Sequence, residues 1–256
     1  MYVAEIWRYP VKSMAGERLD HVQVGPLGLQ GDRIVHVEDR RGRVVTARTH
    51  PRLLGCRASL DHAGEPRVDG QVWTEASVGA AVEGIVGGGA RLVRDESAGR
   101  FDILPLLVAT DGAIAAFGYD GRRLRPNLII GRVQGLDERT WPGSCLRIGE
   151  VRIGLEDLRG RCVMTTFDPD TLAQDRQVLT SIVQRFGGKL ALNAAVIRGG
   201  QIREGAEVEL VTVEACTESP ATESVPSETS RHPRNPNGET SERFGNQHRT
   251  CFRRTA

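Results

Sequence analysis

The sequence predicts a mainly β protein with a few helices, an α+β fold whose strands fall into two successive parts. Two observations support this class. Short β-prone segments separated by glycine and proline turns fill the first hundred residues, which is typical of a barrel or a sandwich. Beyond residue 90 more strands follow with one or two helices among them, so a doubly wound parallel sheet is not expected. We therefore expect an N-terminal β domain, barrel-like or a sandwich, at residues 1–90, a second domain at 91–213 and a disordered tail at 214–256.

The N-terminal part begins with the β-prone segments YVAEIW and DHVQVG. RIVHVEDRRGRVVTA is predicted to be a hairpin that turns at Asp39–Gly42, and CRASLDHAGEPRVDGQVWTEA repeats the pattern of short strands. His36 lies in the hairpin and is expected to be a strand residue. The glycines at 87–89 end this part; no lysine or hydroxyl follows them, so they do not predict a phosphate-binding loop.

The second part starts with FDILPLLVAT, a predicted buried strand. TDGAIAAFG is a predicted helix with Thr110 or Asp111 as its N-cap and Gly118 after its end. The segments expected to be further strands are RPNLIIG, CLRIGEVRIGL, CVMTTF, LALNAAVI and AEVELVTV.

The clearest helical signal lies in TLAQDRQVLTSIVQRFGG. Leu179, Ile182, Val183 and Phe186 recur at i, i+3, i+4 and i+7, which predicts that they form the buried face, and Gly187 stops the helix. From about Glu214 onward the chain is polar, with almost no aliphatic residues, and cannot bury enough apolar area to offset the entropy of ordering.

Composition argues against several classes of partner and predicts a reducing setting. The formal net charge is +1, so no bulk attraction to nucleic acid or to an anionic membrane is expected. Of the 34 basic residues only Lys12 and Lys189 are lysines, so any anion site would be built largely from guanidinium groups. The five cysteines are scattered without a CxxC pair, and the N-terminus has no apolar leader, so we expect a cytoplasmic protein.

Common catalytic motifs are missing from the chain. It has no GxSxG, no HExxH and no GxxxxGK[ST]. Sequence order alone does not exclude a Ser-His-Asp triad, but no feature points to one.

Four stretches combine polar or charged residues with turn signals. They are YPVKS, GLQGDR, RRLRPN and RGRC. In the last of these, the positive charges of Arg159 and Arg161 would favour the thiolate form of Cys162, the form that attacks electrophiles and binds metals. Taken one at a time, the four stretches are better explained as a β-turn, a surface ion pair, a solvated charge run and a core thiol.

Taken together, the stretches resemble the MOSC family, named for the C-terminal domain of molybdenum-cofactor sulfurases. The resemblance is greatest to the two-part members with an N-terminal β-barrel, which include the amidoxime-reducing components. It rests on the order and spacing of YPVKS, GLQGDR, GRVVTARTHPRL, FDILPLLVAT, RRLRPNLII and RGRCVMTTFDPDT, which span roughly residues 3 to 210.

The resemblance implies a MOSC-type β-barrel and a molybdenum–pterin cofactor. It makes Cys162 the protein ligand to the metal, a soft thiolate added to a metal held by a dithiolene. It places Asp102 near the metal as a catalytic acidic residue, and Arg161 beside the thiolate. The residues expected to hold the pterin and its phosphate are Lys12, Ser13, Arg33, Arg125 and Asn127.

The chain departs from the family pattern at three places. Met14 and Ala15 replace a small polar residue or cysteine and then a basic residue, and Gly160 replaces a hydroxyl residue. ALNAAVI has small residues where relatives tend to have an aromatic one. These differences concern the pocket wall and leave the expected metal ligand in place.

The leading functional hypothesis is an oxidoreductase that reduces N-hydroxylated or related small molecules. No flavin or iron–sulfur motif is present, so electrons would come from an external ferredoxin-, cytochrome b5- or flavoprotein-like partner. The alternative is a persulfide carrier or a cofactor-handling protein, in which Cys162 needs no metal. Pyridoxal phosphate is not expected, because neither lysine has a suitable motif context. A non-catalytic β domain with an interaction tail remains a third hypothesis.

Overall fold

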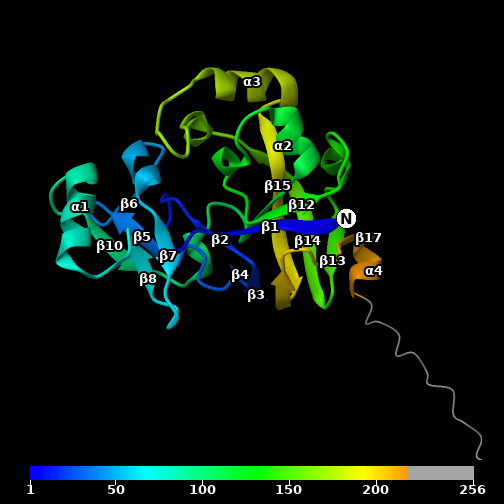
Figure 1. The fold of residues 1–256 in the computed structure, drawn as a ribbon, viewed down its shortest axis with the longest axis horizontal. Helices are drawn as coiled ribbons and strands as arrows, with labels where there is room; N and C mark the ends of the chain where they lie inside the picture. Colours follow the sequence, from blue (N-terminus) through cyan, green and yellow to red (C-terminus); the bar gives the residue numbers. More distant parts are fainter. Residues whose placement is uncertain (218–256) are drawn as a thin grey trace, which may run out of the picture. The chain divides into compact units, whose positions relative to one another are not determined.

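An eight-stranded sheet forms the larger layer of the computed structural model, which describes residues 1–217 (Figure 1). The strand order is β17-β13-β14-β15-β11-β12-β1-β2. All neighbours are antiparallel except β11 and β12, which are parallel and are connected through helix α2. The strands are β1 (Tyr2–Arg8), β2 (Glu17–Leu19), β11 (Leu106–Thr110), β12 (Leu128–Gly131), β13 (Ser144–Ile148), β14 (Val151–Gly160), β15 (Lys189–Arg198) and β17 (Glu209–Thr212).

Three small antiparallel sheets complete the β structure, in the orders β10-β5-β6, β16-β3-β4 and β7-β8-β9. The chain therefore begins in the large sheet, leaves it after β2 and returns to it at β11. The strands of the small sheets are β3 (His21–Gly25), β4 (Gly28–Leu29), β5 (Val35–Glu38), β6 (Val44–Val45), β7 (Ala58–Leu60), β8 (Pro66–Val68), β9 (Gln71–Val72), β10 (Arg91–Arg94) and β16 (Gly200–Arg203).

Helical segments are short; all but α4 lie between strands, and α4 follows β17. The α-helices are α1 (Ala76–Val86), α2 (Asp111–Phe117), α3 (Gln177–Phe186) and α4 (Val213–Thr217). The 3-10 segments are η1 (Pro51–Gly55), η2 (Ala98–Arg100), η3 (Gly121–Leu124), η4 (Asp137–Thr140) and η5 (Val163–Thr166). Within the described residues, none of these helices is both long enough and apolar enough to span a bilayer.

The mainly β prediction is confirmed, and so are several local features. The hairpin turns between β5 and β6, where Gly42 N donates to Asp39 O at 2.9 Å. Helix α2 is capped by Thr110, whose side chain accepts from Ala113 N, and it ends at Gly118 with a left-handed φ of 78°. His36 lies on β5 and is buried.

Two segments differ from the sequence prediction. Helix α1 occupies a region that was expected to contain only strands. Its buried residues are Val78 and Val82, one helical turn apart, and its two glycines weaken the helical hydrophobic pattern in the sequence. The expected strand CVMTTF forms η5 instead. The Thr165 and Thr166 hydroxyls donate to carbonyls three residues earlier, at 2.9 and 2.7 Å, which stabilises a tight turn instead of an extended chain.

Three boundaries or faces also differ. Residues 101–105 are not part of β11. Helix α3 buries Val178, Ile182 and Phe186, whereas Val183 is 56% exposed, so the buried face follows an i, i+4, i+8 spacing. Residues 213–217, where the tail was expected to begin, form α4, and Cys216 is disulfide-bonded to Cys145 on β13. The rest of the expected tail, 218–256, lies outside the described residues.

One hydrophobic cluster supports the large sheet together with the small sheet β16-β3-β4, and another supports the sheets β10-β5-β6 and β7-β8-β9. One contains Val3, Ile6, Leu128, Ile130 and Leu192, with other residues of the large sheet. The second contains Val11, Val35, Val37, Leu53 and Val82. Strands β1 and β2 belong to the large sheet although they precede residue 90, and the boundary between the two expected domains stays a prediction.

Candidate functional site

A cavity of about 360 Å³ brings together all the residues assigned to the site from the sequence. Its remaining wall includes apolar side chains such as Leu104, Leu106 and Met164. The assigned residues that line it are Lys12, Ser13, Arg33, Asp102, Arg125, Asn127, Arg161 and Cys162.

The YPVKS turn carries Lys12 and Ser13 into the cavity. Lys12 N donates to Val35 O at 2.8 Å, and Ser13 has a left-handed φ of 70°, so the chain reverses direction at this point. The Lys12 ammonium donates to Arg100 O at 2.9 Å and forms an ion pair with Asp102 at 2.7 Å. The turn is therefore fixed at both its backbone and its lysine side chain.

The GLQGDR turn presents Arg33 beside this lysine. Asp32 is fully buried, accepts from Tyr9 N at 2.7 Å and pairs with the Arg33 guanidinium. Arg33 itself has a left-handed φ of 54°, and its backbone N–H donates to Tyr9 O at 2.8 Å. A buried carboxylate and a fixed backbone thus hold the Arg33 guanidinium at the cavity wall.

Asn127 mainly positions the backbone around the site. Its side-chain oxygen accepts from Leu107 N at 3.1 Å, and its amide nitrogen donates to Trp7 O at 3.2 Å. Its side-chain oxygen also lies 3.4 Å from the Arg33 guanidinium, which donates to it. Asn127 therefore joins β1, β11 and β12 beside the cavity.

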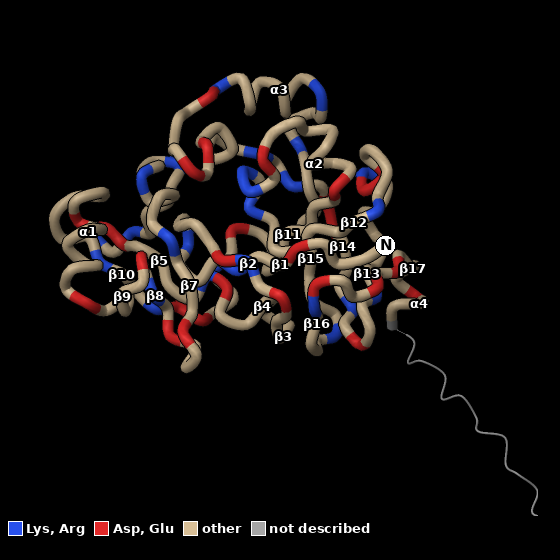
Figure 2. The backbone as a smooth tube through the Cα atoms, in the orientation of Figure 1, with Lys and Arg blue, Asp and Glu red and all other residues tan. Residues whose placement is uncertain are grey.

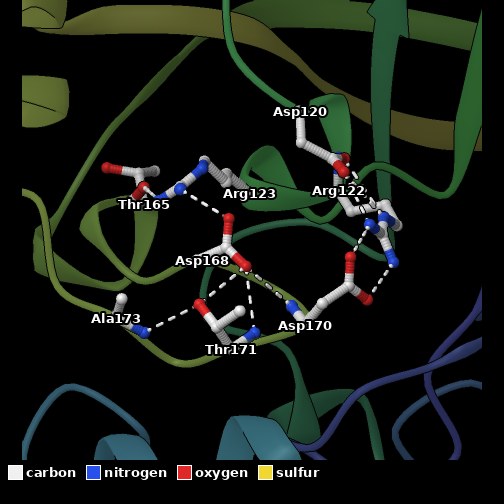
Figure 3. Close-up of polar contacts among 8 residues, drawn as sticks. All are labelled: Asp120, Arg122, Arg123, Thr165, Asp168, Asp170, Thr171 and Ala173. Carbon is white, nitrogen blue, oxygen red and sulfur yellow. Dashed lines mark hydrogen bonds and ion pairs between the residues drawn. The ribbon is translucent and has the colours of Figure 1, made fainter.

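Cys162 lies two residues after the end of β14 and immediately before η5, and its thiol is free and half-buried. The loop after it is held against the segment that precedes Arg125 (Figure 3). Arg123 pairs with Asp168 at 3.0 Å and donates to Thr165 O at 3.3 Å, while Arg122 pairs with Asp170 at 2.6 Å.

Asp102 is surrounded by cations. Its carboxylate pairs with Lys12, with Arg48 at 2.8 Å and with Arg159 at 3.5 Å. Burial acts to raise the pKa of Asp102, but the Lys12 hydrogen bond and the neighbouring positive charges outweigh it and hold the pKa below its usual value. Asp102 is therefore ionised at neutral pH and acts as an acceptor and counter-ion, not as a proton donor.

Two arginines in the cavity lack an anionic partner. Burial lowers the pKa of Arg125 and of Arg161 to about 10. The Arg125 guanidinium stacks on the Tyr9 ring at 4.2 Å and has no ion pair or hydrogen bond with any described residue. Arg161 donates one hydrogen bond to Leu124 O at 2.7 Å, and its buried Nε has no acceptor. Partly buried cations without an anionic partner are costly, so these two favour an anionic occupant of the cavity.

The cavity also contains residues that the sequence analysis did not assign to the site. Arg48 lies in the matching stretch GRVVTARTHPRL, and Arg159 was noted only for its charge near the thiol. Asn193 lies within the stretch ALNAAVI; it accepts from Arg159 at 3.1 Å and donates to Asp157 at 2.8 Å. Arg48 and Arg159 could have been found from their place in these stretches, but the Asn193 contact depends on the pairing of β14 with β15.

The side chains of the cavity fit a metal that is bound within an anionic organic cofactor. Among the described residues, no three His, Cys, Asp or Glu side chains converge as a protein-only metal site requires. Cys162 provides one soft ligand, so the other ligands would have to come from the cofactor itself. The unpaired guanidinium groups of Arg125 and Arg161 suit its phosphate.

Fold and site together define a class: a β-rich protein with a thiol-containing, arginine-lined cavity whose charge suits an anionic ligand. Residues 1–87 match the family model of the MOSC N-terminal beta barrel domain, and residues 113–209 match that of the MOSC domain. Together these matches cover most of the chain, and the protein belongs to the MOSC family. This confirms the family identified from the sequence motifs.

Related proteins carry names that describe a reductase. The chain is 26% identical to mitochondrial amidoxime reducing component 2 of Macaca fascicularis, over 68% of this chain and 69% of that protein. It is 25% identical to mitochondrial amidoxime-reducing component 1 of Homo sapiens, over 68% of each chain. Among solved structures, the YUAD protein from Bacillus subtilis aligns with a TM-score of 0.47 and 11% identity, over 82% of this chain and 95% of that one.

Proposed function

We propose that the protein is a molybdenum-cofactor-dependent reductase of N-oxygenated small molecules. One observation carries the proposal: the free thiol of Cys162 shares a cavity with the unpaired guanidinium groups of Arg125 and Arg161. The names of the amidoxime-reducing relatives supply the substrate class.

The residues of the cavity divide into three roles in this proposal. Cys162 ligates the metal. Arg125 and Arg161 neutralise the cofactor phosphate or the polar edge of the pterin, with Lys12, Ser13 and Arg33 beside them. Asp102 holds the cations around it in place, because its carboxylate contacts three of them and stays ionised.

The proposed reaction converts an amidoxime to an amidine. The N–O bond breaks, two electrons and two protons are consumed, and the oxygen leaves as water. The bound molybdenum cofactor would supply the two-electron redox chemistry. The chain's own groups orient the substrate: the Asp102 carboxylate accepts an N–H or O–H hydrogen bond, and apolar residues such as Leu104 limit access of water.

Electrons have to reach the site from another protein. The sequence has no flavin or iron–sulfur motif, so a separate ferredoxin-, cytochrome b5- or flavoprotein-like donor completes the cycle.

The test is metal and pterin content of the full chain, produced in a host that makes molybdenum cofactor. We expect close to one molybdenum and one pterin per chain. Cys162→Ala should lower the retained metal by about tenfold, equivalent to about 1.4 kcal/mol of binding free energy. Cys56→Ala is the matched control, because Cys56 is the other free thiol among the described residues and does not line the cavity.

The outcomes separate the reductase from sulfur transfer. Two results together support the proposal. Cys162→Ala loses metal while Cys56→Ala keeps it, and the unchanged metal-loaded protein reduces an amidoxime when a chemical reductant supplies the electrons. Absence of molybdenum from the unchanged chain, in a host with ample cofactor, overturns it. A persulfide on Cys162, detected by mass spectrometry of that metal-free protein, would instead establish the sulfur-carrier alternative.

A further inference from the structure

A second cavity of about 260 Å³ adjoins the thiol cavity. Arg123, Arg125 and Met164 line both cavities, so these three side chains form a shared wall. Cys162 and Asp102 do not line the second cavity. The proposed reduction therefore gives this space no role.

Aromatic and apolar side chains form most of the second cavity. The rings of Trp7, Tyr9 and Phe167 line it, with Leu54 and Pro169. All of these except Tyr9 remain partly exposed. Partly exposed rings around a concave space are typical of a ligand site, because a flat apolar molecule can cover them and remove their surface from water.

The charges at the second cavity select an anion. The Arg57 guanidinium is exposed, lines the cavity and has no ion pair or side-chain hydrogen bond with any described residue. Arg125 lies in the shared wall and is also unpaired. Asp170 is the acidic residue in the lining, and its carboxylate is already paired with Arg122 at 2.6 Å. The positive charge is therefore in excess.

We propose that this second cavity binds a planar aromatic anion, a fused or single ring that carries a carboxylate or phosphate. The ring lies among Trp7, Tyr9 and Phe167, and the acid group faces Arg57 or Arg125. An apolar cavity of about 150 Å³ already holds a benzene ring, so about 260 Å³ leaves room for a second ring or for the acid group.

Arg125 and Met164 face both cavities. A ligand in the second cavity therefore contacts two side chains that also line the first. The proposal does not depend on the reductase function. The second cavity keeps its rings and its Arg57 whether or not a cofactor occupies the first.

The experiment is calorimetric titration of the full chain with 2-naphthoate, using protein grown with and without molybdate and assayed for metal. We expect saturable binding to both preparations and at least about fivefold weaker binding of the neutral analogue 2-naphthamide, since a charge-assisted hydrogen bond is lost. Transferred magnetisation from the Trp7 indole to the naphthalene ring, measured by NMR, locates the ligand.

Two variants test the site, each with a matched control. Ala15→Leu fills the cavity and should abolish binding, whereas Ala63→Leu, on an exposed turn outside it, should not. Arg57→Gln should weaken naphthoate about fivefold without changing naphthamide, and Arg52→Gln, an exposed arginine outside the cavity, should leave both unchanged.

Three results would overturn the proposal. The first is unchanged naphthoate binding by the folded Ala15→Leu and Arg57→Gln variants. The second is equal affinity for naphthoate and naphthamide. The third is loss of binding when the protein is loaded with cofactor, because the second cavity would then be part of the cofactor site. None of these results bears on whether Cys162 ligates molybdenum.

Discussion

Glu138 is a buried acidic residue away from the proposed chemistry. One carboxylate oxygen accepts from the Thr110 hydroxyl at 3.1 Å, and the other, Oε1, has no hydrogen-bond partner. Burial raises the pKa of Glu138 above its usual value of 4.5, and the Thr110 hydrogen bond offsets this only in part. The folded state therefore holds a proton on Glu138 more readily than the unfolded state does.

This proton preference makes stability depend on pH. The free energy of unfolding should fall as pH rises from about 4.5 through the higher folded-state pKa, because only the folded state must then ionise a buried group. Glu138→Gln removes the charge and should stabilise the fold by about 1–3 kcal/mol at pH 8. The gain should shrink toward pH 5, as measured by urea unfolding at both values.

The adjacent Asp137 provides the control for this prediction. Asp137 is exposed, so Asp137→Asn should change the free energy of unfolding little at pH 8. A Glu138→Gln variant that is less stable than the unchanged chain at pH 8 would contradict the prediction, because the ionised carboxylate would then make a net stabilising contribution.

At the scale of elements, hydrogen bonds and close packing hold helix α2 against the loop after β12. The Asp111 carboxylate accepts from Arg132 N at 2.7 Å and from Val133 N at 3.0 Å. Gly112 packs so closely that a Cβ there would lie 2.4 Å from Val133 O and 2.6 Å from Gly135 O. Both obstacles are backbone atoms, so neither can move aside without shifting the chain.

The same substitution should have opposite effects in two helices. Gly112→Ala in α2 should destabilise the protein by about 1–3 kcal/mol through overpacking. Gly79→Ala in α1 should stabilise it by about 0.5–1 kcal/mol, because a Cβ there meets nothing within 4 Å and alanine favours the helix. Denaturant midpoints of the two variants test this directly; a tolerated Gly112→Ala would contradict the close docking of α2.

At the scale of the whole described chain, the Cys145–Cys216 disulfide connects distant parts of the sequence. The two cysteines are 71 residues apart, and they join β13 to helix α4. Both are buried, which shields the bond from solution thiols. Cross-linking a loop of this length lowers the entropy of the unfolded chain and so stabilises the folded state.

The disulfide should contribute about 4 kcal/mol to the free energy of unfolding. Reduction under conditions that open the fold should therefore lower the melting temperature of the unchanged chain. The Cys145→Ala, Cys216→Ala double variant should start at the lower value and not respond to reductant. A melting temperature of the unchanged chain that is insensitive to reductant, with two free thiols found by alkylation, would contradict the bond.

The charge distribution of the described residues agrees with the sequence analysis. Basic and acidic residues are interspersed along the described chain, without an extended stretch of one sign (Figure 2). Positive charge is instead in local excess at the two adjoining cavities. This arrangement suits small anions better than an extended polyanion.

The sequence predicted most strands, the cap of α2 and the hairpin at Asp39–Gly42, because each depends on residues a few positions apart. It missed α1, where Gly79 and Gly84 weaken the helical pattern. It also predicted that Val183 of α3 is buried, but among the described residues no neighbouring element covers that side of the helix. Burial of one face depends on what packs against it, which a local pattern does not contain.

The sequence alone determined the mainly β class, the MOSC family and the set of residues assigned to the site, because motif order and turn chemistry are local properties of the chain. Only the tertiary structure decided which charges find partners. Lys12 meets Asp102 and Tyr9 meets Pro126 across about a hundred residues, while Arg125 is left unpaired between two cavities. Pairing and cavity shape arise from contacts between distant segments, and those contacts exist only once the strands have assembled.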